Sequence, residues 1–253
     1  MAKIITFANQ KGGVGKTTSA VNIAAAVGAL GHRVLLVDMD PQGNTSSGVG
    51  INKKTMKLST YDALIQRSPA YSCIIPTEFQ NLWVMPSNIS LAGAEFELVN
   101  DDNRYFRMKA ALDQVREQYD YIFIDCPPSL GNLTINALVA CDGVIVPMQC
   151  EYYSLEGLSQ LMVSLREIKK RYNPELEIVG ILITMYNGRL NLSLQVMAEL
   201  KKYYAGKIFS TTILRNVRLS EAPSYGMPIR YYDKYSKGCQ AYDEVAKEII
   251  ERI

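Results

Sequence analysis

The chain has 253 residues, 48% of them hydrophobic, so it can bury a large core, and we expect a single domain over residues 1–253. Its formal charge of +2 excludes a binder that attracts nucleic acid by bulk charge, so such binding needs a local patch. Five cysteines without a C-x-x-C pair argue against a disulfide framework and for a reducing, cytoplasmic location. No signal-peptide pattern opens the chain, and no apolar run approaches the roughly 18 to 20 residues that span a bilayer.

Short apolar runs alternate with longer helical patterns along the chain, an order typical of a parallel sheet covered by helices. The expected strands are Ile4 to Asn9, Arg33 to Asp38, Leu82 to Pro86, Tyr121 to Asp125, Gly143 to Pro147, Ile178 to Met185 and Ile208 to Ile213. The expected helices are Lys16 to Leu30, Arg104 to Gln118, Leu133 to Ala140, Ser154 to Lys170, Leu190 to Tyr204 and Gln240 to Arg252. We therefore predict an α/β fold with a mostly parallel central sheet of seven to eight strands and helices on both faces. The irregular stretch from Gly48 to Ala94 is interpreted as excursions on this sheet.

A glycine-rich turn joins the first expected strand to the first expected helix. Its sequence is Lys11-Gly12-Gly13-Val14-Gly15-Lys16-Thr17-Thr18. Such a turn lets backbone N–H groups approach phosphate oxygens, and the helix dipole adds attraction for an anion. Lys16 is placed to contact the β- and γ-phosphates, and the Thr17 hydroxyl to ligate Mg²⁺. Because both flanking elements are in place, we expect these eight residues to bind MgATP rather than only to connect a strand and a helix.

Acidic residues end two other expected strands. Asp38 and Asp40 follow the second strand, and Asp125 ends the fourth. A carboxylate at such a place can reach Mg²⁺ or orient an attacking water, and the alternative is a turn or helix-cap residue. We expect Asp40 and Asp125 to serve the metal together with Thr17.

The loop departs from the usual G-x-x-x-x-G-K-[ST] pattern, because Gln10 stands where a glycine is usual and Lys11 is additional. With Asp38-Met39-Asp40-Pro41-Gln42-Gly43-Asn44 and Tyr121-Ile122-Phe123-Ile124-Asp125-Cys126-Pro127-Pro128, it resembles the ParA/MinD family of deviant-loop ATPases, which have the P-loop NTPase fold. The segments from Gln149 to Leu158 and from Arg215 to Ser224 narrow this resemblance to the chromosomal ParA proteins of the Soj type. The resemblance spans essentially the whole chain.

The resemblance implies an ATPase for chromosome or plasmid partition, slow alone and stimulated by a ParB-like protein. It implies that Asp40 is the hydrolysis residue and that Lys11 and Lys16 complete the catalytic set, with Lys11 crossing the interface of an ATP-dependent homodimer to the partner's phosphates. Asn216 is implied to contact adenine, although Leu214 stands where the family commonly has proline. The Soj resemblance also points to a replication initiator as a further partner.

Three classes of protein share such a loop and have to be compared: those that bind DNA, those that bind a membrane and those that hold an iron–sulfur cluster. Residues 201–240 carry eight Lys or Arg against two acids, a net charge of +6, which fits salt-sensitive binding of DNA but also an ordinary solvated surface. The resemblance implies that the ATP-bound dimer holds double-stranded DNA non-specifically through Arg189 and Arg218 and is associated with the nucleoid. The alternative is a MinD-like membrane-associated positioning ATPase. Its anchor would be the tail from Asp243 to Ile253, but this tail has four acids and two bases, so we expect it to pack on the sheet and expect no membrane partner.

The third class, the iron–sulfur relatives of the nitrogenase iron protein, needs placed cysteines, and no second clear ligand accompanies Cys126. Tyrosine pairs are a separate feature that could stack on single-stranded bases. We expect them instead to pack at the edges of the layers; they are Tyr152-Tyr153, Tyr203-Tyr204 and Tyr231-Tyr232.

Overall fold

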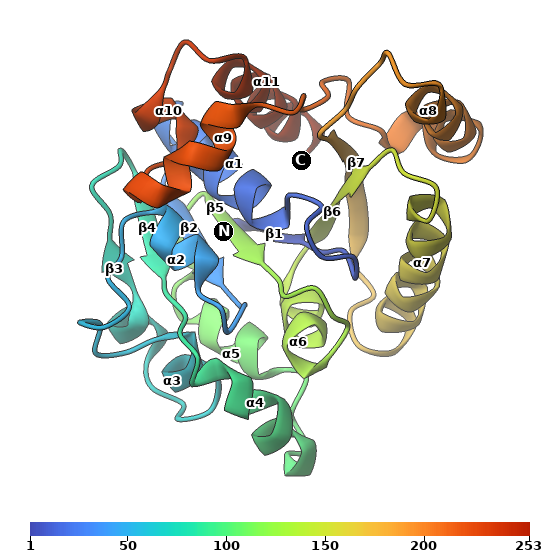
Figure 1. Cartoon of the computed structure of the whole chain (residues 1–253). Coiled ribbons are helices and arrows are strands. Elements are labelled where there is room, and N and C mark those ends of the chain that lie inside the picture. The colour runs from blue at the N-terminus through green and yellow to red at the C-terminus, as the bar shows by residue number, and fades with distance from the viewer.

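Seven strands form one sheet in the computed structural model, which describes residues 1–253 (Figure 1). The strand order is β3-β4-β2-β5-β1-β6-β7, and every neighbouring pair is parallel except β3 with β4. The strands are β1 (Lys3–Phe7), β2 (Val34–Asp38), β3 (Ile75–Pro76), β4 (Leu82–Met85), β5 (Tyr121–Asp125), β6 (Gly143–Gln149) and β7 (Glu177–Thr184). The predicted α/β fold with a mostly parallel sheet is confirmed.

Helices cover both faces of the sheet (Figure 1). They are α1 (Lys16–Ala29), α2 (Asn44–Gly48), α3 (Thr60–Leu64), α4 (Leu91–Glu97), α5 (Arg107–Asp113), α6 (Asn132–Ala140), α7 (Ser154–Arg171), α8 (Asn191–Tyr204), α9 (Val217–Glu221), α10 (Ile229–Tyr232) and α11 (Lys237–Arg252). None of them is both long and apolar enough to span a bilayer.

Two apolar cores lie on either side of the sheet, and single strands contribute to both. On β1, Ile4 belongs to the core under α3 to α8, whereas Ile5 belongs to the core under α1 and α11. The same alternation separates Ile122 from Phe123 on β5. Because successive side chains of a strand point to opposite faces, a strand buried on both faces has to be apolar throughout. This explains the unbroken apolar runs in the sequence.

The expected strand from Ile208 to Ile213 was wrong. Only isolated bridges remain there, from Ile208 to Ile181 and from Leu214 to Tyr186. The chain leaves the sheet at Ser210, whose backbone N–H and hydroxyl donate to the Glu248 carboxylate on α11 at 3.0 and 2.6 Å. It returns at Ile213, whose N–H donates to the Ile183 carbonyl at 2.8 Å. A backbone N–H that is bound to a side chain is not available for a strand ladder.

Two other details were not predicted correctly. The helix expected from Arg104 to Gln118 is divided into α5 and a short 3₁₀ turn over Arg116–Gln118. The irregular stretch after Gly48 contributes β3, an antiparallel edge strand of two residues that includes Pro76. Proline is tolerated at this place because an edge strand has one side without ladder bonds.

The strand order brings the predicted motifs together. β5 lies between β1 and β2, so Asp125 is in register with Phe7 on one side and with Asp38 on the other. The loop after β1 therefore begins beside the carboxyl ends of β5 and β2, the edge where α/β sheets bind ligands.

Candidate nucleotide-binding site

The loop between β1 and α1 has a backbone that favours glycine. Gly13 and Gly15 have φ angles of 73° and 84°, in the left-handed region that other residues rarely adopt. Gly15 is also the N-cap of α1, and no side chain caps this helix. The first N–H groups of α1 are therefore left for an anion.

Polar side chains at the carboxyl ends of β6, β7 and β1 itself hold the loop in place. Gln149, at the end of β6, donates its amide to the Gly13 carbonyl at 2.8 Å, and Thr184, at the end of β7, donates its hydroxyl to the Val14 carbonyl at 2.8 Å. Asn9 accepts from the Lys11 N–H at 3.0 Å and donates to the carbonyl of Pro147 on β6 at 2.8 Å. None of these residues was predicted to have a role, although each is polar and lies at the carboxyl end of an apolar strand.

Lys16 is buried although it carries a charge. Only 7% of the residue is exposed, and its Nζ donates to the Lys11 carbonyl at 3.1 Å. Burial lowers the pKa of Lys16, while the nearby charges of Asp125 and Asp40 oppose this shift. A buried ammonium at a helix N-terminus that lacks a cap fits a polyphosphate.

Thr17 and Asp125, the two residues expected on opposite sides of a metal ion, lie in direct contact. The hydroxyls of Thr17 and Thr45 both donate to Asp125 Oδ2 at 2.7 Å. The second carboxylate oxygen, Oδ1, is buried and has no hydrogen-bond partner. Burial raises the pKa of Asp125 to about 6, although the hydrogen bonds from Thr17 and Thr45 act to lower it. An unpaired buried oxygen beside a threonine hydroxyl fits Mg²⁺, which prefers oxygen ligands and would neutralise the carboxylate.

The two acids after β2 have different surroundings. Asp38 is fully buried and accepts from the Ser46 N–H at 2.8 Å, the Ser46 hydroxyl at 2.6 Å and the Asp40 N–H at 3.1 Å. Burial, with the charge of Asp125, raises the pKa of Asp38 to about 7. Asp40 Oδ1 accepts from the Gln42 N–H at 2.9 Å, and no hydrogen bond engages its Oδ2. The structure thus uses Asp38 to shape the turn and leaves an oxygen of Asp40 free.

Lys11 does not point into the loop of its own chain. Its ammonium forms an ion pair with Glu151, which follows the end of β6, and both side chains are partly exposed. The ammonium of Lys11 is thus held outside the phosphate loop by Glu151.

A small cavity adjoins the start of α1. It has a volume of about 230 Å³ and is lined by Gly15, Thr18 and residues of the segment 213–223, including Asn216. Asn216 caps α9, because its Oδ1 accepts from the Arg218 N–H at 2.8 Å. Its amide Nδ2 is therefore the group that remains for an adenine ring nitrogen.

The two predicted DNA-binding arginines differ in their partners. Arg189, in the connection from β7 to α8, makes no ion pair and lines a cavity of about 620 Å³ together with Arg215. Arg218 pairs with Glu221 at 2.8 Å and with Asp233 at 3.5 Å. Pairing also neutralises other bases of residues 201–240, since Lys202 contacts Glu199 at 2.6 Å and Arg230 contacts Asp243 at 2.8 Å. The local field is weaker than the charge of +6 suggests.

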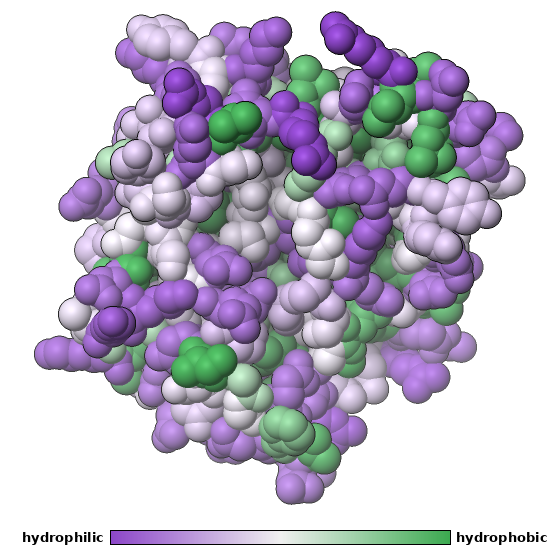
Figure 2. Space-filling view, viewed as in Figure 1, coloured by the Kyte–Doolittle hydropathy of each residue, from purple (hydrophilic) through white to green (hydrophobic).

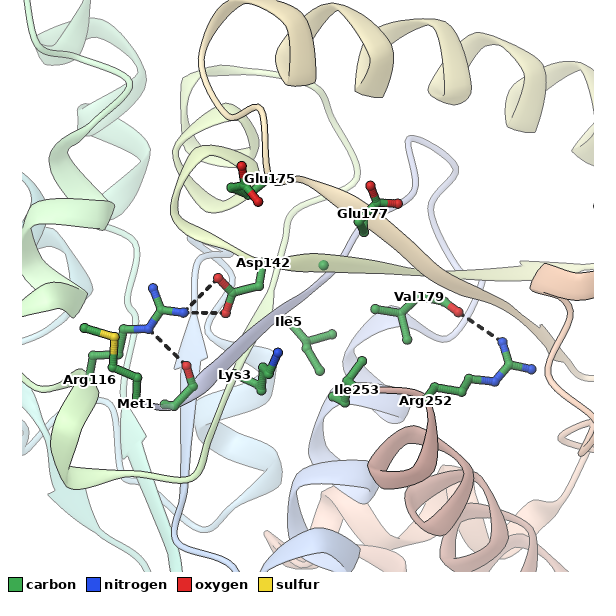
Figure 3. A pocket seen from close by; sticks show the side chains of 12 residues that line it. Met1, Lys3, Ile5, Arg116, Asp142, Glu175, Glu177, Val179, Arg252 and Ile253 are labelled. Carbon is green, nitrogen blue, oxygen red and sulfur yellow. Dashed lines mark hydrogen bonds and ion pairs between the residues drawn. The ribbon is translucent and has the colours of Figure 1, made fainter.

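Another cavity, of about 510 Å³, lies at the opposite edge of the sheet (Figure 3). Most charged side chains that line it are already bound to other groups of the same chain. Arg116 pairs with Asp142 at 2.6 Å and donates to the Ala2 carbonyl at 3.0 Å, and Arg252 donates to the Val179 carbonyl at 3.0 Å (Figure 3). Because it lies at the amino ends of the strands, we do not assign it to the nucleotide site.

Known proteins resemble this chain over nearly its full length. A family model described as an AAA domain matches residues 2–178. The chain is 54% identical to the sporulation initiation inhibitor protein Soj of Bacillus subtilis, over 98% of each chain. It is 50% identical to the chromosome partitioning protein ParA of Myxococcus xanthus, over 100% of this chain and 89% of the relative. The solved structure of cobyrinic acid a,c-diamide synthase from Mycobacterium smegmatis, with bound ATP analogue and magnesium, matches with a TM-score of 0.87 and 34% identity, covering 98% of this chain and 93% of the other.

Proposed function

The chain belongs to the ParA/MinD family of P-loop ATPases, on its Soj side, and we propose that it is a MgATP-dependent ATPase that partitions chromosomal or plasmid DNA. The observation that carries this proposal is the contact of Thr17 with Asp125, whose second buried oxygen has no partner, beside the buried ammonium of Lys16. These groups provide a metal site and a phosphate site on one loop. The names of the relatives, Soj and chromosome partitioning ParA, support the biological role.

Five residues of the site share the tasks of phosphoryl transfer to water, which depends on positioning and on charge stabilisation. Mg²⁺, when bound, neutralises charge on the phosphates. Thr17 and Asp125 would hold it, and Lys16 would bind the phosphate oxygens. Asp40, through its free oxygen, would orient the water, and the amide of Asn216 would contact adenine.

Lys11 points to an active dimer. In its own subunit the ammonium is bound by Glu151, outside the loop. We propose that in an ATP-bound sandwich dimer Lys11 exchanges this carboxylate for the phosphates of the partner subunit. Catalysis by one chain would then be slow, because the charge that stabilises the transition state is absent.

The dimer is proposed to hold double-stranded DNA without sequence preference through Arg189 and Arg218, and to leave it after hydrolysis stimulated by a ParB-like protein. A membrane role is less well supported, because Tyr242, Val245 and Ile249 of α11 are buried in the core that includes α1. An anchor helix would have to expose this apolar face.

The test is the ATPase rate of the full chain alone, with random duplex DNA, and with both DNA and the ParB-like protein. We expect a slow rate that rises only when the partner is present. The Lys16→Ala variant, which lacks the phosphate-binding ammonium, is the negative control. A fast rate without the partner, or flotation of the chain with anionic liposomes in ATP, would contradict the proposal.

A further inference from the structure

A groove runs between α7 and α8, on the outer side of the carboxyl edge. It consists of two adjoining cavities of about 510 and 430 Å³, and Leu155, Glu156 and Glu199 line both. Its walls are otherwise apolar, aromatic or uncharged. We call this surface the α7–α8 groove, and the residues that matter here are Tyr152, Tyr153, Leu155, Glu156, Glu199 and Tyr203.

Three of the four tyrosines that line the groove are exposed, whereas Tyr204 packs against the core. Tyr152, Tyr153 and Tyr203 are 73%, 72% and 73% exposed, so the expectation that these tyrosines pack at layer edges was wrong for them. Figure 2 shows apolar side chains gathered over α8 on an otherwise mostly hydrophilic face. Exposed tyrosines beside apolar residues are typical of protein interfaces, because the ring provides contact area and the hydroxyl a hydrogen bond.

The charge of the groove has one sign. Glu156 and Glu199 are its only charged lining residues, and no Lys or Arg lines either cavity. Glu156 is exposed, and its one contact is the Gln160 amide at 3.4 Å. Glu199 is partly neutralised by Lys202 at 2.6 Å. Charge complementarity therefore selects an occupant that carries Lys or Arg together with apolar side chains.

The groove is connected to the nucleotide site through a short segment of chain. Tyr152 and Tyr153 directly follow Glu151, which binds Lys11, and Gln149 just before them holds the Gly13 carbonyl. The Glu151 carbonyl accepts from the N–H of Ser154, the first residue of α7, at 3.0 Å. An occupant that moves the turn between β6 and α7 also moves Gln149 and Glu151, which contact Gly13 and Lys11 of the phosphate loop.

We propose that the α7–α8 groove docks a basic, amphipathic segment of the protein that stimulates hydrolysis. Lys or Arg of this segment pairs with Glu156 and Glu199, and its apolar side chains cover Tyr152 and Tyr153. Docking shifts the turn after β6 and with it Gln149, whose amide holds the Gly13 carbonyl of the phosphate loop. This inference rests on the proposed function, since it assigns a site to its partner.

The first test uses the full chain, duplex DNA and the intact ParB-like protein. Glu156→Lys and Tyr153→Ser should each lower the partner-stimulated ATPase rate about tenfold, and leave the basal rate and DNA retention unchanged. Glu175→Lys is the matched control, because Glu175 is exposed and makes no ion pair but lies at the cavity of Figure 3. Full stimulation of both groove variants would overturn the groove assignment alone. If the partner fails to stimulate even the unmodified chain, the proposed function falls, and the groove assignment with it.

The second test locates the contact directly and does not depend on rates. A benzophenone amino acid at position 153 should cross-link to the ParB-like protein in ATP. The same group at Tyr71 should not, because Tyr71 is similarly exposed at 66% but lies in the 3₁₀ turn before β3, at the opposite edge of the sheet from β7. Cross-links at 153 only between copies of this chain would show that a second copy occupies the groove and would overturn the proposal.

Discussion

Removing Arg189 should weaken DNA binding and reduce its dependence on salt. Arg189 makes no ion pair within the chain, so its whole charge is available to a phosphate. Each neutralised phosphate changes the slope of log K against log salt by about 0.9, so a dimer of Arg189→Ala that loses two contacts should lose about 1.8 from the slope.

Arg218→Ala should have a smaller effect on the same slope. The guanidinium is held by Glu221 at 2.8 Å and by Asp233 at 3.5 Å, so it must loosen these pairs before it can bind a phosphate. Glu221→Gln removes the nearer acid and should strengthen DNA binding and steepen the slope.

The assay is fluorescence anisotropy of a random duplex, titrated with the ATP-bound protein over a series of KCl concentrations. Arg33→Ala is the control, since Arg33 is paired with Asp120 at 2.9 Å and lies at the amino ends of the strands, just before β2, whereas Arg189 follows the carboxyl end of β7. Sedimentation must show that each variant still dimerises with ATP. An unchanged slope for Arg189→Ala, or a larger loss for Arg218→Ala, would refute this reasoning.

Three further predictions concern the nucleotide site. Lys11→Ala should retain nucleotide binding and lose ATP-driven dimerisation and hydrolysis, and a normal ATP-bound dimer in sedimentation would contradict the role in trans. Gly15→Ala should destabilise the protein by about 1–2 kcal/mol in urea unfolding, because its φ is 84°, whereas Gly12→Ala should be nearly neutral, since Gly12 has no positive φ and a Cβ there would lie 3.8 Å from Pro128. Burial raises the pKa of Asp38 to about 7 and of Asp125 to about 6, so their contribution to stability is full below pH of about 4 and is lost as the pH rises through 6 to 7. The free energy of unfolding without nucleotide should therefore fall between about pH 4 and pH 7, and MgADP should offset much of this fall; a flat profile without nucleotide would show that the two carboxylates are not perturbed.

Much of the candidate site could be predicted because its parts are local in the sequence. The strand, turn and helix around Lys16 are contiguous, and the acid that ends the apolar run of β5 is Asp125. The strand order then brings Asp125 to the hydroxyl of Thr17 at 2.7 Å, so the two residues that the sequence proposes as metal ligands are neighbours. The alternation of apolar runs and helical patterns likewise predicted the parallel sheet.

Other features could not be predicted, because they depend on residues that are far apart in the chain. The pairing of Lys11 with Glu151 joins residues 140 positions apart, and the hydrogen bond from Thr184 to the Val14 carbonyl spans 170 positions. The segment from Ile208 to Ile213 is apolar enough for a strand, yet Glu248 of α11 takes the N–H of Ser210. Local propensity does not contain such competition for a backbone donor.

The phosphate loop, the acid that ends β5 and the parallel sheet can be derived from the sequence alone, since each follows from periodicity or from a contiguous motif. Where the charges act depends on how the chain folds. Arg218 and Arg189 are the same residue type in the sequence, but folding places Asp233 and Glu221 on the first and no acid on the second. The same holds for Tyr152 and Tyr153, which remain exposed beside a groove between two helices, because burial depends on which elements pack together and not on the hydropathy of a residue.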